Sequence, residues 1–188
     1  NKYHEQKERD LDYVDLLNSD KSYHIMAPSQ FGITCYARFL SYVAWKELEK
    51  HWVYVDCKNW TLSKIQSDIE KSARIHNISI KDIDCLLLDN WRNNIKDIEK
   101  ISLKLKNLLP NKRFIILSHG TDIVSVDLAT KESHEGFIDL YLREIRRQDL
   151  RTVVSSIDGE HEIADEDVVV ERLNQDLITL NLHRIPFT

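Results

Sequence analysis

The sequence predicts an α/β fold in which a parallel sheet of about five strands is flanked by helices and followed by a small helical lid. Short apolar runs alternate along the chain with amphipathic helical patterns, an order typical of βαβ units around a parallel sheet. The 188 residues include only four glycines, whereas average usage would give roughly 13. Because sandwiches and small barrels need glycine in their many turns, this scarcity argues against an all-β domain.

Five apolar runs have the length and composition of strands. The run at 84–88 is short and largely apolar, as expected for a strand buried on both faces, whereas the run at 137–144 alternates apolar and polar residues. Between the runs, apolar residues recur every three or four positions, which predicts amphipathic helices. The predicted strands cover residues 22–27, 52–57, 84–88, 113–118 and 137–144, and the predicted helices cover about residues 33–50, 62–73, 95–108, 147–157 and 165–180.

The same pattern divides the chain into three parts. Residues 1–20 are expected to form a charged linker helix, residues 21–145 the α/β core, and residues 146–188 a truncated helical lid. The chain does not begin with methionine, and it stops at residues 186–188, where a new helix is expected to start. We therefore expect a fragment of a larger protein.

The charge balance limits the partners that this chain can bind. Lysine and arginine number 26 against 31 aspartates and glutamates, a net charge of −5, which provides no global basic field for nucleic acid or an anionic membrane. No apolar run approaches the roughly 18 residues of a membrane span. The cysteines Cys35, Cys57 and Cys85 are odd in number and scattered, which favours buried thiols in a reducing cytoplasm.

The segment between the first strand and the first long helix reads APSQFGIT (27–34). This is the setting of a phosphate-binding loop, whose pattern is GxxxxGK[ST]. Gly32 supplies the second glycine and Thr34 the hydroxyl that binds Mg²⁺, whereas Ala27 replaces the first glycine and Ile33 the lysine. The candidate nucleotide-binding residues of this loop are Ser29, Gln30, Phe31, Gly32, Ile33, Thr34 and Cys35.

Two further strand ends carry polar residues that fit the same chemistry. Asp89 follows three leucines at the end of a buried strand, where a carboxylate can hold Mg²⁺ through water opposite Thr34. Ser118 ends the next predicted strand, where a polar side chain would contact the γ-phosphate or the attacking water. We take Asp89, Asn90 and Ser118 as candidate catalytic residues, and Thr34 with Asp89 as the candidate magnesium ligands.

Together with the downstream segments RRQDLR (146–151) and LNLHRIPF (180–187), these strand ends resemble the STAND branch of the AAA-like P-loop NTPases. The resemblance implies a helical lid after the fifth strand, with Pro186 packed on the adenine of a bound ATP or ADP and Mg²⁺ at the phosphates. It also implies a regulatory module between effector and sensor domains that switches by nucleotide-gated oligomerisation. In prokaryotes such modules often serve in defence against phage.

The sequence departs from that family at two positions that matter for catalysis. Ile33 removes the main cation from the phosphate site, and Asn90 stands where many relatives carry a glutamate that activates water. An amide can position water but cannot accept its proton, so we expect ATP hydrolysis to be absent or very slow. The missing charge could be supplied by Arg38, Arg92, Arg146 or Arg147.

Several hypotheses stay open at this point. One alternative is a pseudo-ATPase that binds no nucleotide and serves as an interaction or oligomerisation scaffold. Another is an AAA-like ATPase that loads on DNA, which the acidic balance opposes. The eight histidines show no metal-site spacing. A nucleophile pair of Cys35 or Ser118 with His119 lacks the GxSxG elbow, so a buried thiol and a strand-end serine are the simpler interpretation. For Trp60 and Trp91, core packing is favoured over a role in a pocket.

Overall fold

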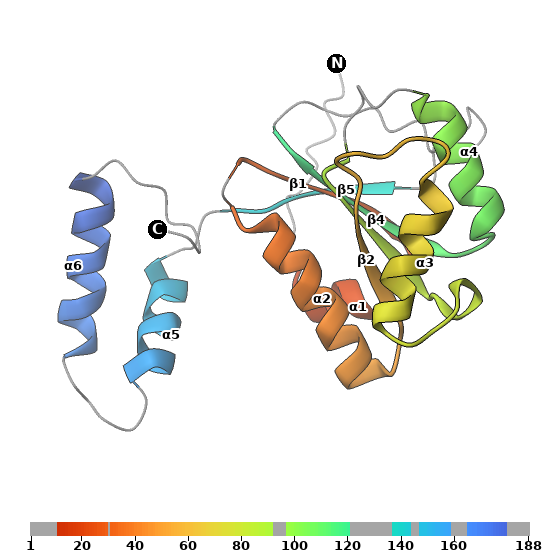
Figure 1. Cartoon of the computed structure of the whole chain (residues 1–188). Coiled ribbons are helices and arrows are strands. Elements are labelled where there is room, and N and C mark those ends of the chain that lie inside the picture. The colour runs from red at the N-terminus through yellow and green to blue at the C-terminus, as the bar shows by residue number, and fades with distance from the viewer. Residues whose placement is uncertain are drawn as a thin grey trace, which may run out of the picture.

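The computed structural model describes residues 11–29, 31–91, 97–120, 137–143, 147–158 and 165–179. It contains five strands and six α-helices within these ranges, together with one short 3-10 helix at Ile80–Asp82 (Figure 1). The strands are β1 (Ser22–Ala27), β2 (Trp52–Asp56), β3 (Cys85–Asp89), β4 (Arg113–His119) and β5 (Phe137–Tyr141). The helices are α1 (Tyr13–Asn18), α2 (Ile33–Leu48), α3 (Ile65–Ile75), α4 (Ile98–Leu108), α5 (Arg147–Asp158) and α6 (Glu166–Thr179).

All five strands run parallel in one sheet with the order β2-β3-β4-β1-β5. The predicted α/β class and the five-stranded parallel sheet are therefore confirmed. Because the strands are parallel, their carboxyl ends lie at one edge, where open α/β sheets bind ligands at the point of reversed strand order. The loop after β1, Asp89 at the end of β3 and Ser118 near the end of β4 all lie at this edge.

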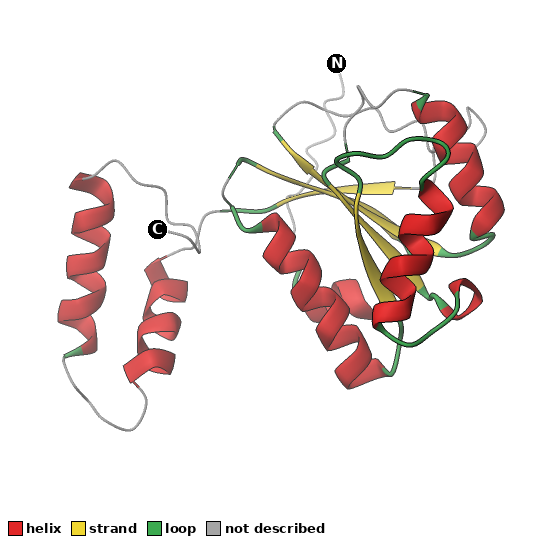
Figure 2. Ribbon diagram, in the orientation of Figure 1, coloured by secondary structure: helices red, strands yellow, loops and turns green. Residues whose placement is uncertain are grey.

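Helices cover both faces of the sheet and make two apolar cores (Figure 2). Successive strand residues point to opposite faces, so Leu87 packs with α1 and α2, whereas Leu86 and Leu88 pack with α3 and α4. All three leucines are fully buried, as expected for a parallel strand covered on both sides. The two faces matter below because they separate the candidate site residues.

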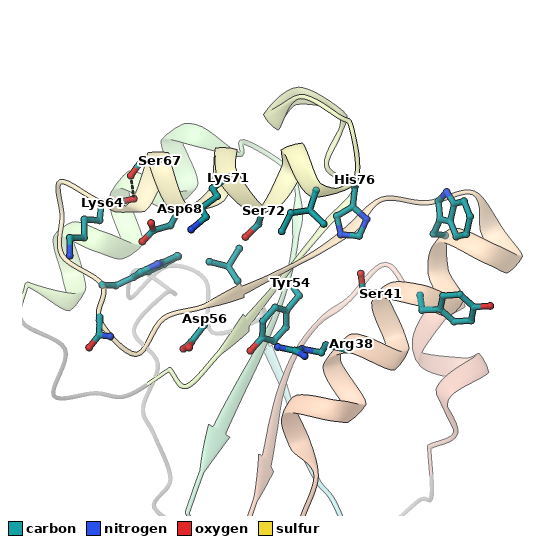
Figure 3. Close-up of a pocket in the computed structure, with 16 residues that line it drawn as sticks. Arg38, Ser41, Tyr54, Asp56, Lys64, Ser67, Asp68, Lys71, Ser72 and His76 are labelled. Atoms are coloured by element: carbon teal, nitrogen blue, oxygen red, sulfur yellow. Dashed lines mark hydrogen bonds between the residues drawn. The ribbon is translucent and has the colours of Figure 1, made fainter.

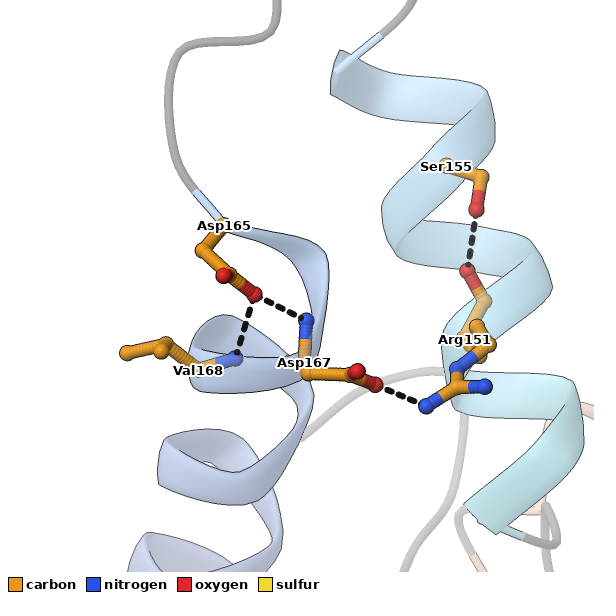
Figure 4. A network of polar contacts seen from close by, with 5 residues as sticks. All are labelled: Arg151, Ser155, Asp165, Asp167 and Val168. Atoms are coloured by element: carbon orange, nitrogen blue, oxygen red, sulfur yellow. Dashed lines mark hydrogen bonds and ion pairs between the residues drawn. The ribbon is translucent and has the colours of Figure 1, made fainter.

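Helices α5 and α6 pack against each other. Asp165 begins α6 by accepting the backbone N–H groups of Asp167 and Val168 at 2.9 and 3.3 Å, and Asp167 forms an ion pair with Arg151 of α5 (Figure 4). The capping carboxylate satisfies N–H groups that the first helical turn leaves unpaired. The predicted division into linker, core and lid stays a prediction.

Three expectations about individual side chains are settled by burial. Cys57 and Cys85 are buried, as predicted, but Cys35 is exposed, so the interpretation of Cys35 as a buried thiol is wrong. The reason is its place on the solvent side of the first turn of α2. Trp60 and Trp91 are buried and form an edge-to-face pair with centroids 6.4 Å apart, which confirms core packing.

Among the described helices, none combines the length and the apolar character needed to cross a membrane.

Candidate nucleotide site

The loop after β1 leads directly into the N-terminus of α2. Gly32 is the N-cap, with φ 76° and ψ 20° in the left-handed region that glycine adopts without strain, and no side chain caps the helix. The Phe31 N–H donates to the Pro28 carbonyl at 3.3 Å, which turns the chain toward the helix. The first N–H groups of this 16-residue helix therefore face the sheet edge and form the kind of donor set that binds anions.

The same loop lacks a cation at the position where a lysine would contact phosphate. The Ile33 side chain is only 1% exposed and packs in the core beneath α2 with Ala27, which is equally buried. No residue of the segment 27–35 is basic. Backbone dipoles are thus the main attraction for an anion here, without the stronger contribution of a charge-assisted hydrogen bond.

Asp89 is the centre of a buried hydrogen-bond cluster at this edge. Its side chain is fully buried. Oδ2 accepts a hydrogen bond from Thr34 Oγ1 at 2.7 Å and another from the Tyr54 hydroxyl at 2.8 Å. Oδ1 accepts the Asn90 backbone N–H at 2.8 Å. The structure thus brings together two residues that the sequence paired, Thr34 and Asp89, and adds Tyr54 to them.

The Thr34 hydroxyl and the Asp89 carboxylate are hard oxygen donors of the kind that Mg²⁺ binds together with phosphate oxygens. Their chemistry therefore fits a magnesium ion carried by a nucleotide. The Tyr54 phenol competes for the same carboxylate oxygen. Burial, then the hydrogen bond and charge of Asp89, raise the pKa of Tyr54 well above its ordinary value, so it stays a neutral donor to that carboxylate.

The side chain of Asn90 is held by a hydrogen bond at the end of β2. Its backbone lies in the left-handed region at φ 57°, and its Nδ2 donates to Asp56 Oδ1 at 3.0 Å at the end of β2. Asparagine tolerates this backbone region better than most residues. The amide therefore links the ends of β2 and β3. It is not basic enough to take a proton from an attacking water.

Ser118 lies on the other face of the sheet from Asp89. Its hydroxyl and His24 Nε2 are 2.8 Å apart, and His24 Nδ1 and Asp139 Oδ1 are 3.1 Å apart, so a polar chain crosses β4, β1 and β5. Neighbouring Leu117 packs with α2, on the face that Asp89 also shares. Because side chains alternate along a strand, the next residue on the face of Leu117 is His119, which is exposed at the edge. His119 rather than Ser118 thus shares the face of Asp89.

Sequence reasoning missed Tyr54 and His24, because neither belongs to a recognised motif. Of the other candidates, Ser29, Phe31 and Cys35 lie in the described loop and the first turn of α2, and Arg38 lies 5.2 Å from the centroid of the Tyr54 ring. Arg147 begins α5. Gln30, Pro186, Arg92 and Arg146 lie outside the described residues. No group of three or more histidine, cysteine or acidic side chains in the described ranges could hold a metal ion.

Replacing Tyr54 by phenylalanine should lower the free energy of unfolding by about 1.5–3 kcal/mol, the range for a hydrogen bond to a charged group. The ring remains and only the donor to Asp89 is lost. Urea unfolding followed by circular dichroism measures the difference. Tyr42→Phe is the matched control, because Tyr42 is 55% exposed and its variant should unfold like the natural chain. Equal stability of both variants would contradict the assigned hydrogen bond.

Five parallel strands in the order β2-β3-β4-β1-β5, with helices on both faces, make this a P-loop NTPase-like α/β fold. No protein-family model matches the sequence, and no curated protein sequence matches it. Solved structures do match. The replication initiator DnaA bound to AMPPCP and single-stranded DNA aligns with TM-score 0.53 at 14% identity, over 86% of this chain and 52% of that one.

Two further structures give the same result. AMPPCP-bound DnaA from Aquifex aeolicus has TM-score 0.51 and 14% identity over 86% of this chain and 53% of that one. A DNA replication initiation factor has TM-score 0.50 and 13% identity over 85% of this chain and 52% of that one. The chain thus spans about half the length of these structures and shares their fold.

Proposed function

We propose that this chain is a nucleotide-binding regulatory module of the AAA+ class, of the STAND type, that hydrolyses ATP slowly or not at all. The observation that carries the proposal is the 2.7 Å hydrogen bond between Thr34 and Asp89 at the head of α2. It joins a helix N-terminus that attracts phosphate to an oxygen pair that suits Mg²⁺. Two of the similar structures are bound to AMPPCP, which supports a nucleotide as the ligand.

The expected slow hydrolysis rests on two residues: Ile33 of the degenerate phosphate-loop motif, and Asn90, which follows Asp89. Ile33 supplies no charge to the β- and γ-phosphates. Asn90 supplies no base, and its amide is already bonded to Asp56. A bound magnesium ion would neutralise phosphate charge, with Thr34 and Asp89 as its holders. The protein groups that remain can bind and orient a nucleotide, which is sufficient for a switch but not for fast turnover.

The wider role rests on the resemblance of the sequence to the STAND branch. We place the module between effector and sensor domains of a longer protein, with homo-oligomerisation as its output and antiphage defence as its setting. Its three free cysteines favour a reducing compartment such as the cytoplasm. A role in loading on DNA is opposed by the net charge of −5, although one of the similar structures is bound to single-stranded DNA.

A second candidate function is a scaffold that binds no nucleotide. It is favoured by the hydrogen bonds of Asp89, whose two oxygens already accept from Thr34, Tyr54 and Asn90. With these donors in place, the buried carboxylate does not require a metal ion to stabilise its charge. In this case the fold would serve oligomerisation alone.

Titration with ATP and ADP, with and without Mg²⁺, distinguishes the two functions. A binding-competent module should gain RT ln(1 + [L]/Kd) in unfolding free energy, about 2.7 kcal/mol at 100 times Kd. Thermal unfolding and calorimetry measure it. Thr34→Val, which keeps the shape but removes the hydroxyl, should lose the magnesium-dependent part of the gain. No stabilisation by either nucleotide at millimolar concentration would reject the switch and leave the scaffold.

A further inference from the structure

A groove of about 1170 Å³ runs along an open edge of the sheet, between α2 and α3 (Figure 3). Strand β2 is the terminal strand of the sheet and pairs with β3 alone among the described strands. Tyr54, Val55 and Asp56 of β2 line the groove, and side chains of the two helices form its walls. The groove thus gives access to the unpaired side of a β-strand.

The hydrogen bonds at the two ends of β2 show which of its residues face β3. The His51 carbonyl accepts the Cys85 N–H at 3.4 Å, and the Cys57 N–H donates to the Asp89 carbonyl at 2.8 Å. The N–H and C=O groups of successive residues point to opposite sides of a strand. The odd-numbered residues from His51 to Cys57 therefore bond to β3, and the even-numbered residues direct their backbone groups outward.

The outward groups of β2 differ along the strand. The carbonyl of Trp52 is taken by the Ser41 hydroxyl of α2. Tyr54 and Asp56 lie further along and line the groove, and within the described residues no hydrogen bond occupies their outward N–H and C=O groups. An open edge of this kind is a template for pairing with another extended chain.

The walls of the groove add side-chain recognition. Tyr42 and Trp45 of α2 are each 55% exposed on one side, and Ile75 of α3 is 78% exposed on the other. Lys64, which precedes α3, and Lys71 within α3 also line the groove and are exposed. Neither forms an ion pair within the described residues. The walls therefore offer apolar contacts and two unpaired cations.

The acidic side chains of the groove do not cancel this charge. Asp56 and Asp68 are the two carboxylates in the lining, against Arg38 and the two lysines. Asp56 Oδ1 already accepts hydrogen bonds from the Lys58 N–H and from Asn90 Nδ2. Unlike the chain as a whole, with its net charge of −5, the groove thus attracts negative charge.

We propose that this groove binds an extended acidic segment of a partner polypeptide, which adds to the sheet as a sixth strand beside β2. The backbone of the segment pairs with the outward groups of Tyr54 and Asp56. Its apolar side chains contact Trp45 and Tyr42, and its carboxylates contact Lys64 and Lys71. Main-chain pairing supplies affinity in such additions, and the flanking side chains supply specificity.

A defined peptide pair tests the proposal with the complete 188-residue chain. The probe is a fluorescein-labelled nonapeptide of alternating glutamate and valine, and its control is the same peptide with lysine for glutamate. Fluorescence anisotropy should show saturable binding of the acidic peptide only. Amide hydrogen exchange should slow at Tyr54 and Asp56 on binding and stay unchanged at Val53 and Val55.

Charge-reversed variants complete the test. The double variant Lys64→Glu/Lys71→Glu should weaken binding of the acidic peptide at least tenfold, whereas Lys81→Glu, an exposed lysine outside the groove, should leave it unchanged. The proposal is overturned by equal binding of both peptides, by no binding at millimolar peptide, or by binding without protection of the two amides. Self-association that protects the same amides without peptide would also overturn it, in favour of a second copy.

Discussion

Replacement of Ile33 by lysine should tighten binding of ATP with Mg²⁺ by roughly 10- to 150-fold. The longer lysine side chain would leave the core position of Ile33 and extend its ammonium group to phosphates bound at the first turn of α2. A hydrogen bond to a charged group contributes about 1.5–3 kcal/mol, and each 1.4 kcal/mol is tenfold in affinity. Calorimetric titration measures the change. Because Ile33 is 1% exposed in the core, the same variant should also lose about 2 kcal/mol of unfolding free energy or more.

Ile33→Met separates the charge from the change in shape. Methionine is unbranched like lysine but neutral, so its variant should bind nucleotide no better than the natural chain. If both variants bind ATP equally, the missing cation does not limit affinity, and the Tyr54–Asp89 contact becomes the next cause to test. The double variant Ile33→Lys/Tyr54→Phe would do so.

The protein should lose stability as the pH falls from 7 toward 5, because His24 is buried in the neutral form. Burial lowers the pKa of His24 below 6.5, and the hydrogen bond and charge of Asp139 oppose this only in part. The unfolded chain takes up the proton near pH 6.5. The stability is therefore complete above pH 6.5 and falls below it, by up to about 1.4 kcal/mol per pH unit.

Urea unfolding at pH 5, 6 and 7 measures this dependence. His24→Phe should flatten the slope, although it also leaves the Ser118 hydroxyl without its partner and lowers stability at pH 7 by about 1–3 kcal/mol. His119→Gln is the control, since His119 is exposed, and it should keep the slope of the natural chain. An unchanged slope in His24→Phe would assign the pH dependence to another group.

The sequence predicted the strands and the meeting of Thr34 with Asp89, because both follow from short-range patterns. Apolar runs mark buried strands, and parallel strands bring their carboxyl ends to one edge. The Tyr54 contact was out of reach of such reasoning, since it depends on the register of β2 beside β3, where Tyr54 is opposite Leu87. No local pattern encodes that pairing.

Ser118 shows a different limit of sequence reasoning. It was predicted as the last residue of its strand, and it lies one residue before the end of β4. Successive strand residues point to opposite faces, so a shift of one residue reverses the face of a side chain. Ser118 therefore meets His24, while the neighbouring His119 shares the face of Asp89. The His24–Asp139 contact joins positions 115 residues apart, a separation that a single sequence does not connect.

The buried pair Trp60–Trp91 has a practical consequence for spectroscopy. Trp91 stands two residues after Asp89, and Trp60 lines the groove beside β2. These two indoles and that of Trp52 are shielded from water, whereas Trp45 is 55% exposed. The fluorescence of the three buried tryptophans should therefore differ from that of Trp45 in wavelength and in resistance to quenchers such as iodide. Because Trp60 lines the groove and packs against Trp91, the unlabelled protein carries an optical reporter of peptide binding at that groove.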